Sequence, residues 1–329
     1  MKRTMIGGQA VMEGVMMKNL DRYAVAVRKP DKEIVVDIQD YKSYSDRYPI
    51  LKLPILRGVA SFVESLVIGM KTLTYSASFF EEEEEQKSSK VGSFFDKCLK
   101  GKTEDILIGL TVCFSIIMAI GLFMILPYFL ASLIKNWTDS KFIISLLEGI
   151  VRIGLFLLYI TLISKMQDIK RTFMYHGAEH KTINCLEHGE DLTVENIRKH
   201  SRYHKRCGTS FLFIVMVISV IFFMFIQVDG TVEKLILRLL LVPVIAGVSY
   251  EFIRLAGKSD HPLVNWLSKP GIALQGLTTK EPEDEMIEVA IRSVEAVFDW
   301  KPYVEALRKG EVEGCPCMKK EKEKSGKAS

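Results

Sequence analysis

One short stretch near the middle of the chain, YHGAEHK over residues 175–181, carries side chains suited to metal chemistry. His176 and His180 are four residues apart, a spacing that places both imidazoles on one face of a helix, and Glu179 stands beside the second histidine. Two histidines can hold a zinc-type metal, and a neighbouring glutamate can take a proton from water whose pKa the metal lowers toward about 7. The stretch therefore predicts His176 and His180 as metal ligands and Glu179 as a catalytic base.

A catalytic metal held by two histidines requires a third protein ligand, and the sequence offers several. Five of the six histidines fall between residues 176 and 204, and His200 and His204 repeat the four-residue spacing. Cysteine and carboxylate also ligate zinc, which adds Cys207 and Glu251 to the candidates. The predicted cofactor is a divalent metal, with zinc as the first choice, and the third ligand is His200, His204, Cys207 or Glu251.

The same stretch has other interpretations. H-x-x-E-H is the pattern of inverted zinc peptidases, but it fixes only three of five positions. Gly177 also lowers the helix propensity inside it by about 1 kcal/mol relative to alanine. Four protein ligands with no open position would make a structural zinc site. Without any metal, a loop rich in His, Lys and Arg beside a membrane contacts lipid headgroups. The motif alone does not separate these alternatives.

The elements that must position this stretch are membrane-spanning helices. Hydrophobic residues make up 48% of the 329 residues and charged residues 26%, which fits a chain whose apolar residues are concentrated in blocks. A spanning helix needs about 20 mostly apolar residues at about 1.5 Å rise each. Four segments meet this requirement: 106–134, 142–164, 208–228 and 235–256. The sequence predicts a mainly α polytopic membrane protein with four transmembrane helices.

The distribution of positive charge predicts the orientation of these helices. Nine Lys and Arg residues lie in 165–209, whereas 135–141 holds two and 229–234 holds one. Basic residues in short loops stay on the cytoplasmic side of a membrane. The His- and Cys-rich loop 165–209 is therefore predicted to be cytoplasmic, together with both termini. Disulfides are not expected among the cysteines outside the spans, because that compartment is reducing.

The N-terminal segment predicts a small β-sheet on the cytoplasmic face. Residues 23–28 and 33–38 are β-branched runs separated by a Lys-Pro-Asp-Lys turn, which is a hairpin signal. Residues 5–17 could add a strand, with Gly7 and Gly8 as its turn. No signal peptide is expected, because glycines and polar residues interrupt any apolar core near the N-terminus.

Residues 54–80 have helical periodicity, with Arg57, Glu64 and Lys71 on one face because they fall seven residues apart. This pattern predicts an amphipathic helix in the membrane interface, with a fifth span as the alternative. The predicted organisation is a β-rich cytoplasmic subdomain (1–53), the interfacial amphipathic helix (54–80), a charged linker (81–103), the four-helix membrane domain with loop 165–209 (104–256), a cytoplasmic loop and helix (257–300) and a charged tail (301–329).

Two further features carry predictions of their own. Prolines and a glycine predict a loop over 257–280, followed by an amphipathic helix over 282–298. Glu148 and Arg152 fall four residues apart inside the second span, which predicts an ion pair that orients helices. Arg238 is predicted as an anchor at the outer membrane interface.

Six stretches occur together, in order: GGQAVMEGVMMK (7–18), PILRGVASFVESLVIGMKTL (54–73), YHGAEHKTINCLE (175–187), HSRYHKRCGTSFL (200–212), YEFIRLAGK (250–258) and LQGLTTKEPEDEMIEVAI (274–291). In them the chain resembles the bacterial YqhQ-like membrane proteins, a family catalogued as a domain of unknown function and described as predicted metal-dependent enzymes. The resemblance implies a multi-pass bacterial membrane protein with a divalent metal, predicted here for the inner membrane, and polar residues spread over the predicted cytoplasmic segments suit a site assembled on that face. The family-like positions are Glu13, Arg57, Glu64, His176, Glu179, His180, His204, Cys207, Glu251, Gln275, Thr278 and Thr279.

Three functions are consistent with these features. The first is a metal-dependent hydrolase whose substrate, a lipid-linked molecule or a peptide, is met at the cytoplasmic membrane surface. The second is a non-catalytic membrane scaffold or regulatory protein with a structural metal and protein partners on its cytoplasmic face. A transporter is the third and weakest, because the first and third spans carry no charge. Membrane lipid is an expected partner, nucleic acid is not, and the oligomeric state is left open.

Overall fold

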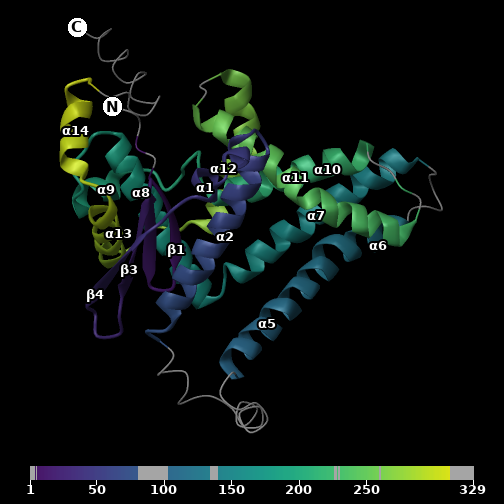
Figure 1. Ribbon diagram of the computed structural model, residues 1–329, viewed down its shortest axis with the longest axis horizontal. Helices are drawn as coiled ribbons and strands as arrows, with labels where there is room; N and C mark the ends of the chain where they lie inside the picture. Colours follow the sequence, from purple (N-terminus) through teal and green to yellow (C-terminus); the bar gives the residue numbers. More distant parts are fainter. Residues whose placement is uncertain are drawn as a thin grey trace. The chain divides into compact units, whose positions relative to one another are not determined.

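The chain is described by a computed structural model, shown in Figure 1, for residue 4 and for residues 6–80, 103–133, 140–225, 228, 230–258 and 261–311. Its parts form two compact units. The first takes Met1–Phe79, Leu162–Ile214 and Ala246–Ser329, and the second takes Phe80–Thr161 and Val215–Ile245. Nearly all of the predicted linker 81–103 lies outside the described residues, as do three cysteines: Cys98, Cys315 and Cys317.

An antiparallel sheet of four strands, in the order β1-β2-β3-β4, lies in the first unit. The strands are β1 (Gly7–Val11), β2 (Gly14–Asn19), β3 (Arg22–Arg28) and β4 (Ile34–Asp40). They confirm the predicted sheet and its hairpin between β3 and β4. The turn predicted at Gly7 and Gly8 is wrong, because both glycines pair with residues of β2. The chain turns instead at Glu13, whose φ of 48° is the kind of backbone angle that tight turns require.

Two helices, α8 (Gln167–Glu187) and α13 (Asp284–Val297), pack against this sheet (Figure 1), and α13 confirms the helix predicted over 282–298. The core joins buried side chains from the sheet and both helices: Val15, Met17, Tyr175, Ile183, Leu186, Met286 and Ile287. Full burial of an aliphatic side chain of this size contributes roughly 1.5–3 kcal/mol. Every residue of α8 from Gly177 to Glu187 is buried, so the C-terminal half of this helix is held on all sides.

Helix α2 is the longest helix between the sheet and residue 80. It follows two short elements, so that the order is α1 (Tyr44–Arg47), a 3-10 turn (Pro49–Lys52) and α2 (Leu56–Ala77). One face of α2 is buried, at Gly58, Glu64 and Ile68. The other face exposes large apolar side chains, including Val63, Leu66, Met70 and Leu73. The predicted amphipathic helix is confirmed, and its location in a membrane interface stays a prediction.

One prediction for the C-terminal part of the chain is wrong. Residues predicted as a loop over 257–280 contain α12 (Pro262–Thr278). Pro262 occupies the first turn of that helix, where no backbone N–H is needed, and Pro270 is accommodated in its interior. A further helix, α14 (Trp300–Arg308), overlaps the start of the predicted charged tail, and its apolar face is buried in the core of the first unit.

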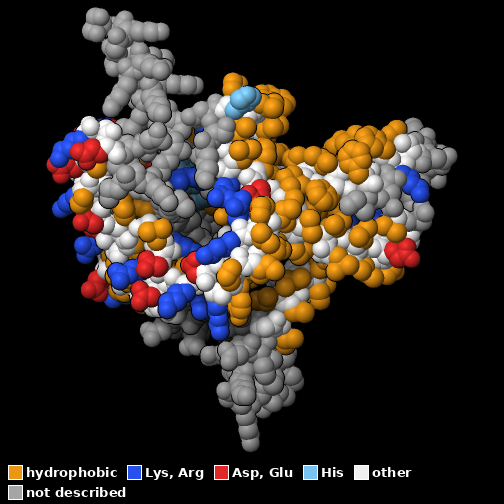
Figure 2. All heavy atoms as spheres, turned by 45° about the horizontal axis from the view of Figure 1, so that its top comes forward, with side chains coloured by type: hydrophobic (Ala, Val, Ile, Leu, Met, Phe, Trp, Pro, Cys, Tyr) orange, Lys and Arg blue, Asp and Glu red, His pale blue; other side chains and the backbone are white. Residues whose placement is uncertain are grey.

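Four apolar helical stretches confirm the predicted membrane fold. The elements are α5 (Thr103–Ile120), a π-helical turn (Gly121–Ile125), α6 (Leu126–Ser132), α7 (Lys141–Ile163), α10 (Gly208–Phe225) and α11 (Thr231–Lys258). The stretches long and apolar enough to cross a membrane are Gly109–Ser132, Lys141–Ile163, Gly208–Phe225 and Val232–Ala256. Hydrophobic side chains gather on the surface of these helices in Figure 2, whereas charged side chains spread over the unit that holds the sheet. Helix α2, the predicted alternative for a fifth span, is not among the described helices that meet this requirement.

Three charged side chains meet inside the second unit. Glu148 of α7 accepts hydrogen bonds from Arg152 of the same helix and from Arg238 of α11, each at 2.7 Å, and all three side chains are buried. Phe223 of α10 covers both guanidinium groups, which lie 5.2 Å and 4.8 Å from its ring centroid. The predicted pair of Glu148 and Arg152 is confirmed. Arg238 is not an exposed anchor, because it bonds to the second oxygen of the same buried carboxylate.

We expect Glu148→Ala to lower the free energy of unfolding by about 3–5 kcal/mol, because it leaves two buried guanidinium groups without their carboxylate. Glu195→Ala is the control, since it removes an exposed partner of Lys199 and should cost about 0.5 kcal/mol or less. Unfolding of the full-length protein in a mild detergent, by heat or denaturant, measures both variants. Equal losses in the two would contradict a structural role for the buried triad.

Candidate metal centre

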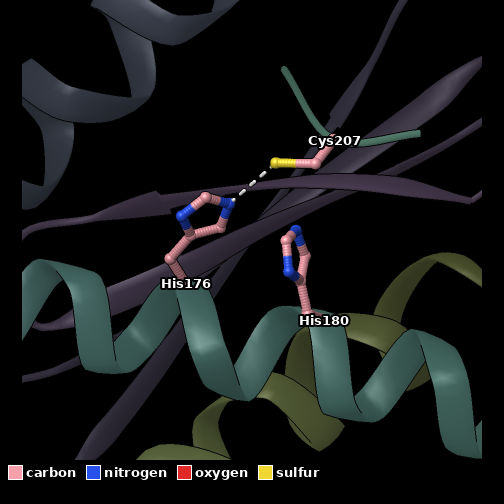
Figure 3. Close-up of side chains that lie close together, drawn as sticks. All are labelled: His176, His180 and Cys207. Atoms are coloured by element: carbon pink, nitrogen blue, oxygen red, sulfur yellow. Dashed lines mark hydrogen bonds between the residues drawn. The ribbon is translucent and has the colours of Figure 1, made fainter. Parts of the chain in front are cut away.

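The H-x-x-E-H stretch lies on α8, as its spacing predicts, and its two histidines share one face of the helix (Figure 3). Their ring centroids are 4.4 Å apart. Cys207, in the segment directly before α10, places its sulfur opposite the two rings, and His176 Nε2 lies 3.2 Å from Cys207 Sγ. One ligand atom from each of these three side chains lies within 4.8 Å of the other two. The structure therefore assembles two nitrogen donors and one sulfur donor.

Backbone carbonyls fix the orientation of both imidazoles. His176 Nδ1 is 2.9 Å from the carbonyl oxygen of Thr278, and His180 Nδ1 is 2.6 Å from that of Arg202. A carbonyl oxygen only accepts, so in each ring Nδ1 carries the proton and donates it, and in the neutral ring Nε2 keeps its lone pair. Metal-ligating histidines are held in this way in most proteins, with the outer nitrogen bonded to a carbonyl or carboxylate.

The sulfur of Cys207 is surrounded by donors as well. The backbone N–H of Thr209 donates to it across 3.4 Å, and the Thr209 hydroxyl lies 3.1 Å away. Thr209 belongs to the first turn of α10, where the backbone N–H groups point outward and favour negative charge. A thiolate is the form of cysteine that ligates metals, so this position suits Cys207 for that role.

Glu179 lies beside both histidines. Its Oε2 is 3.7 Å from His176 Nε2 and 3.9 Å from His180 Nε2. Gly8 of β1 covers the carboxyl group so closely that a Cβ at this position would lie 2.6 Å from Glu179 Cγ, and the Gly8 backbone also hydrogen-bonds to it. Burial raises the pKa of Glu179 to about 7, although His176 and the Gly8 hydrogen bond oppose the rise. A carboxyl group in this range can take up or release a proton near neutral pH.

Gly177, which weakens the helix inside the motif, has a packing reason. A Cβ at this position would collide with the backbone carbonyl oxygen of Lys280. The segment after α12 runs this close to α8 because the Lys280 N–H donates to the Phe173 carbonyl across 2.9 Å. The same close approach brings the Thr278 carbonyl to His176, so the glycine is required by the geometry that orients the first ligand.

Two of the predicted ligands lie elsewhere. His204 is close to the centre, with its ring 5.8 Å from that of His180, but its Nε2 faces Glu187 at 3.5 Å, and burial lowers its pKa. Glu251 accepts hydrogen bonds from Arg57, one of them across 2.5 Å. Neither belongs to the group of three ligand atoms around His176.

The second pair of histidines at four-residue spacing does not share a helix face. Helix α9 (Val194–Lys199) ends before His200, and His204 follows in irregular structure. His200 joins a separate group with Cys185 and Glu190. The predicted loop 165–209 contains two helices, α8 and α9, and the second half of α8 is buried.

The chain matches the family model described as "Protein of unknown function (DUF1385)" over residues 53–300. The chain belongs to this family. It is also 35% identical over 297 residues to "Uncharacterized protein YqhQ" of Bacillus subtilis (strain 168), a comparison that covers 87% of this chain and 90% of that protein. The YqhQ-like resemblance is thereby confirmed. No solved structure matches the chain.

Within the family-matched region lie His176, Glu179, His180 and Cys207, whereas Gly8 precedes it. Nothing in the sequence indicates that Gly8 packs against Glu179 or that the Thr278 carbonyl accepts a hydrogen bond from His176. Gln275 is a third such case: its amide clamps the backbone of His204, accepting from the N–H at 2.9 Å and donating to the carbonyl at 2.7 Å. The family-like positions included Gln275 and Thr278, but nothing in the spacing shows what they contact.

Proposed function

We propose that the chain binds a divalent metal, with zinc as the first choice, through Nε2 of His176, Nε2 of His180 and Sγ of Cys207. The donor set supports this, since imidazole nitrogen and thiolate sulfur suit zinc and related borderline metals. The spacing also fits. Bonds of about 2.0–2.3 Å around a tetrahedral zinc put neighbouring ligand atoms about 3.5 Å apart, and His176 Nε2 is 3.2 Å from Cys207 Sγ.

The function that this centre supports best is metal-dependent hydrolysis. The observation that carries it is the position of Glu179, whose carboxyl oxygen is within 3.7 Å and 3.9 Å of the two histidine nitrogens. Three protein ligands leave a fourth position for water or substrate, and a metal there supplies Lewis acidity and a water of lowered pKa. Glu179 takes the proton as general base, the Gly8 backbone holds its carboxyl group, and His176 and His180 keep their tautomers through Thr278 and Arg202.

The proposed location is the cytoplasmic surface of a bacterial inner membrane, with both termini on that side. Support comes from the four apolar helices and from the nine basic residues in 165–209. A substrate met at such a surface, a lipid-linked molecule or a peptide, suits a site carried on helix α8, which follows the apolar helix α7 directly in the chain. The exposed apolar face of α2 is consistent with contact to lipid.

A non-catalytic role with a structural metal is the second candidate, and burial favours it. The side chains of His176, Glu179 and His180 are only 13%, 6% and 1% exposed. A substrate must reach the metal of a hydrolase, whereas a structural zinc is usually closed off by four ligands. In this alternative the sheet and α13 present surfaces to protein partners, and the metal holds α8 to the segment before α10.

Cobalt substitution separates the two candidates. Full-length protein in a mild detergent is stripped of metal and loaded with Co²⁺, and the thiolate-to-cobalt absorption that disappears in Cys207→Ser identifies the site. We expect azide to change the visible cobalt spectrum saturably, because the fourth position is open, and Glu179→Gln to keep the metal. A cobalt spectrum that azide leaves unchanged would refute the hydrolase and leave the structural metal. No cobalt at the Cys207 site would refute both.

A further inference from the structure

A second group of metal-ligating side chains lies at the C-terminal end of α8, beyond the proposed centre. Cys185, Glu190 and His200 each offer one ligand atom, and these atoms lie within 4.8 Å of one another. Sulfur, carboxylate oxygen and imidazole nitrogen are all zinc ligands. The three residues come from α8, from the loop after it and from the residue that follows α9, so the fold, and not local spacing, brings them together.

The chain reverses to build this group. Gly189, with φ of 74°, follows the end of α8, and its N–H donates to the Leu186 carbonyl. The next residue, Glu190, donates its backbone N–H to the Cys185 carbonyl across 3.2 Å, and its own carbonyl lies 3.9 Å from Cys185 Sγ. Helix α9 then begins at a cap in which Thr193 accepts from the Asn196 N–H, and it ends where His200 returns to Cys185.

Helix α14 holds this loop in place from the other side. Arg308 donates to the Gly189 carbonyl at 2.9 Å and to the Asp191 carboxylate at 3.1 Å. The loop therefore has contacts of its own on both sides, and the three ligand atoms are close together before any metal binds. Such preorganisation lowers the ordering cost of ligand binding.

One atom in the group lacks a partner. His200 Nε2 is buried and makes no hydrogen bond to any of the residues that the structure describes. Buried polar atoms without partners are rare in native proteins and require an explanation. Glu190 Oε2 is only 3.3 Å away. A divalent cation between this nitrogen and the carboxylate would be a partner for both.

His188 adds a fourth donor nearby. Its ring centroid is 5.0 Å from that of His200. Its Nδ1 lies 2.7 Å from the Asn184 carbonyl and donates to it, which is the carbonyl-fixed arrangement also found at His176 and His180. The Cys185 thiol keeps its proton when no metal is bound, because burial raises its pKa to about 12. Its sulfur lies 3.6 Å from the Asp191 carbonyl, to which it donates. A metal bound here displaces that proton.

We propose that Cys185, Glu190 and His200 hold a second divalent metal of the zinc type, which ties the loop after α8 and the end of α9 to α8. The site is structural, since it joins three chain segments. It is independent of the proposed hydrolysis, because its residues are separate from His176, Glu179, His180 and Cys207.

Zinc counting on full-length protein in a mild detergent tests this proposal. Metal-free protein is titrated with Zn²⁺, and bound zinc is measured by elemental analysis. We expect Cys185→Ser and Cys207→Ser each to hold one equivalent less than the wild type, and the double variant to hold two less. Loss of zinc in Cys207→Ser with none in Cys185→Ser would overturn the second site and leave the first. The reverse result would keep the second site and remove the proposed hydrolase centre.

A second variant, Glu190→Gln, tests the same site without changing the buried side chain of Cys185. The Glu190 side chain is 45% exposed, so the substitution should not disturb the core. We expect the zinc-binding step that Cys185→Ser abolishes to lose about tenfold or more in affinity, while the step that Cys207→Ser abolishes is unchanged. Glu195→Gln, an exposed change on α9, is the matched control and should bind as the wild type does. Identical titrations of Glu190→Gln and Glu195→Gln would contradict the proposal.

Discussion

Replacement of His176 or His180 by alanine is expected to lower the zinc affinity of the first centre by about 100-fold or more. Loss of an outer hydrogen-bond partner alone typically costs 10–100-fold, and these variants remove a ligand outright. Cys207→Ser should have a similar effect, because its sulfur is the third donor. Competition titration of the full-length protein against a zinc chelator of known affinity measures the change.

His204→Ala and Glu251→Gln are the controls for that titration, because both residues were predicted as ligands from the sequence. His204 faces Glu187 and Glu251 bonds to Arg57, so the structure gives neither a place in the group of three donors. Both variants should retain the zinc affinity of the wild type. A loss in Glu251→Gln as large as that in His176→Ala would show that the ligand set has been assigned wrongly.

Gly177→Ala is expected to lower the free energy of unfolding by about 1–3 kcal/mol, as overpacking of a tight site does. Alanine is the better helix former by about 1 kcal/mol, so propensity alone predicts the opposite sign. The new Cβ collides with the Lys280 carbonyl, which must move together with the Thr278 carbonyl that holds His176. We therefore expect weaker zinc binding in the same variant.

Gly154→Ala on α7 is the matched control. It is a helical glycine as well, but a Cβ there would meet nothing within 4 Å. It should be neutral or stabilising, with unchanged zinc binding. Thermal unfolding and zinc titration of both variants in the same detergent decide the matter. If Gly177→Ala were as stable as Gly154→Ala, the close approach of α8 and the segment after α12 would not be needed for the site.

The parts of the fold that sequence predicts best are those set by local pattern. Four long apolar blocks predict the spans, β-branched runs predict the hairpin, and four-residue spacing predicts that His176 and His180 share a face. Spacing fails where the helix ends: His200 and His204 have the same separation, but α9 stops before them. Proline misleads in α12, where it occupies a first turn and an interior position that this helix tolerates.

The parts of the site that sequence cannot predict depend on tertiary contact. Nothing near Cys207 in the chain indicates that it, and not Glu251, would meet two histidines on α8. In the sequence, the rest of the sheet and the helices α2 to α7 stand between Gly8 and Glu179. In the fold the two residues meet, and the missing side chain of Gly8 makes room for the carboxyl group. Arg238 was misplaced for the same reason, because its partner Glu148 lies ninety residues away on another helix.

X-ray absorption at the zinc edge tests the proposed centre most directly. The measurement uses full-length Cys185→Ser protein in detergent, loaded with one equivalent of zinc, so that the second group contributes no sulfur. We predict one sulfur at about 2.3 Å and nitrogen or oxygen neighbours at about 2.0–2.1 Å, with imidazole scattering from two histidines and loss of the sulfur when Cys207→Ser is added. A zinc shell without sulfur, or one that Cys207→Ser leaves unchanged, would contradict a metal held by His176, His180 and Cys207.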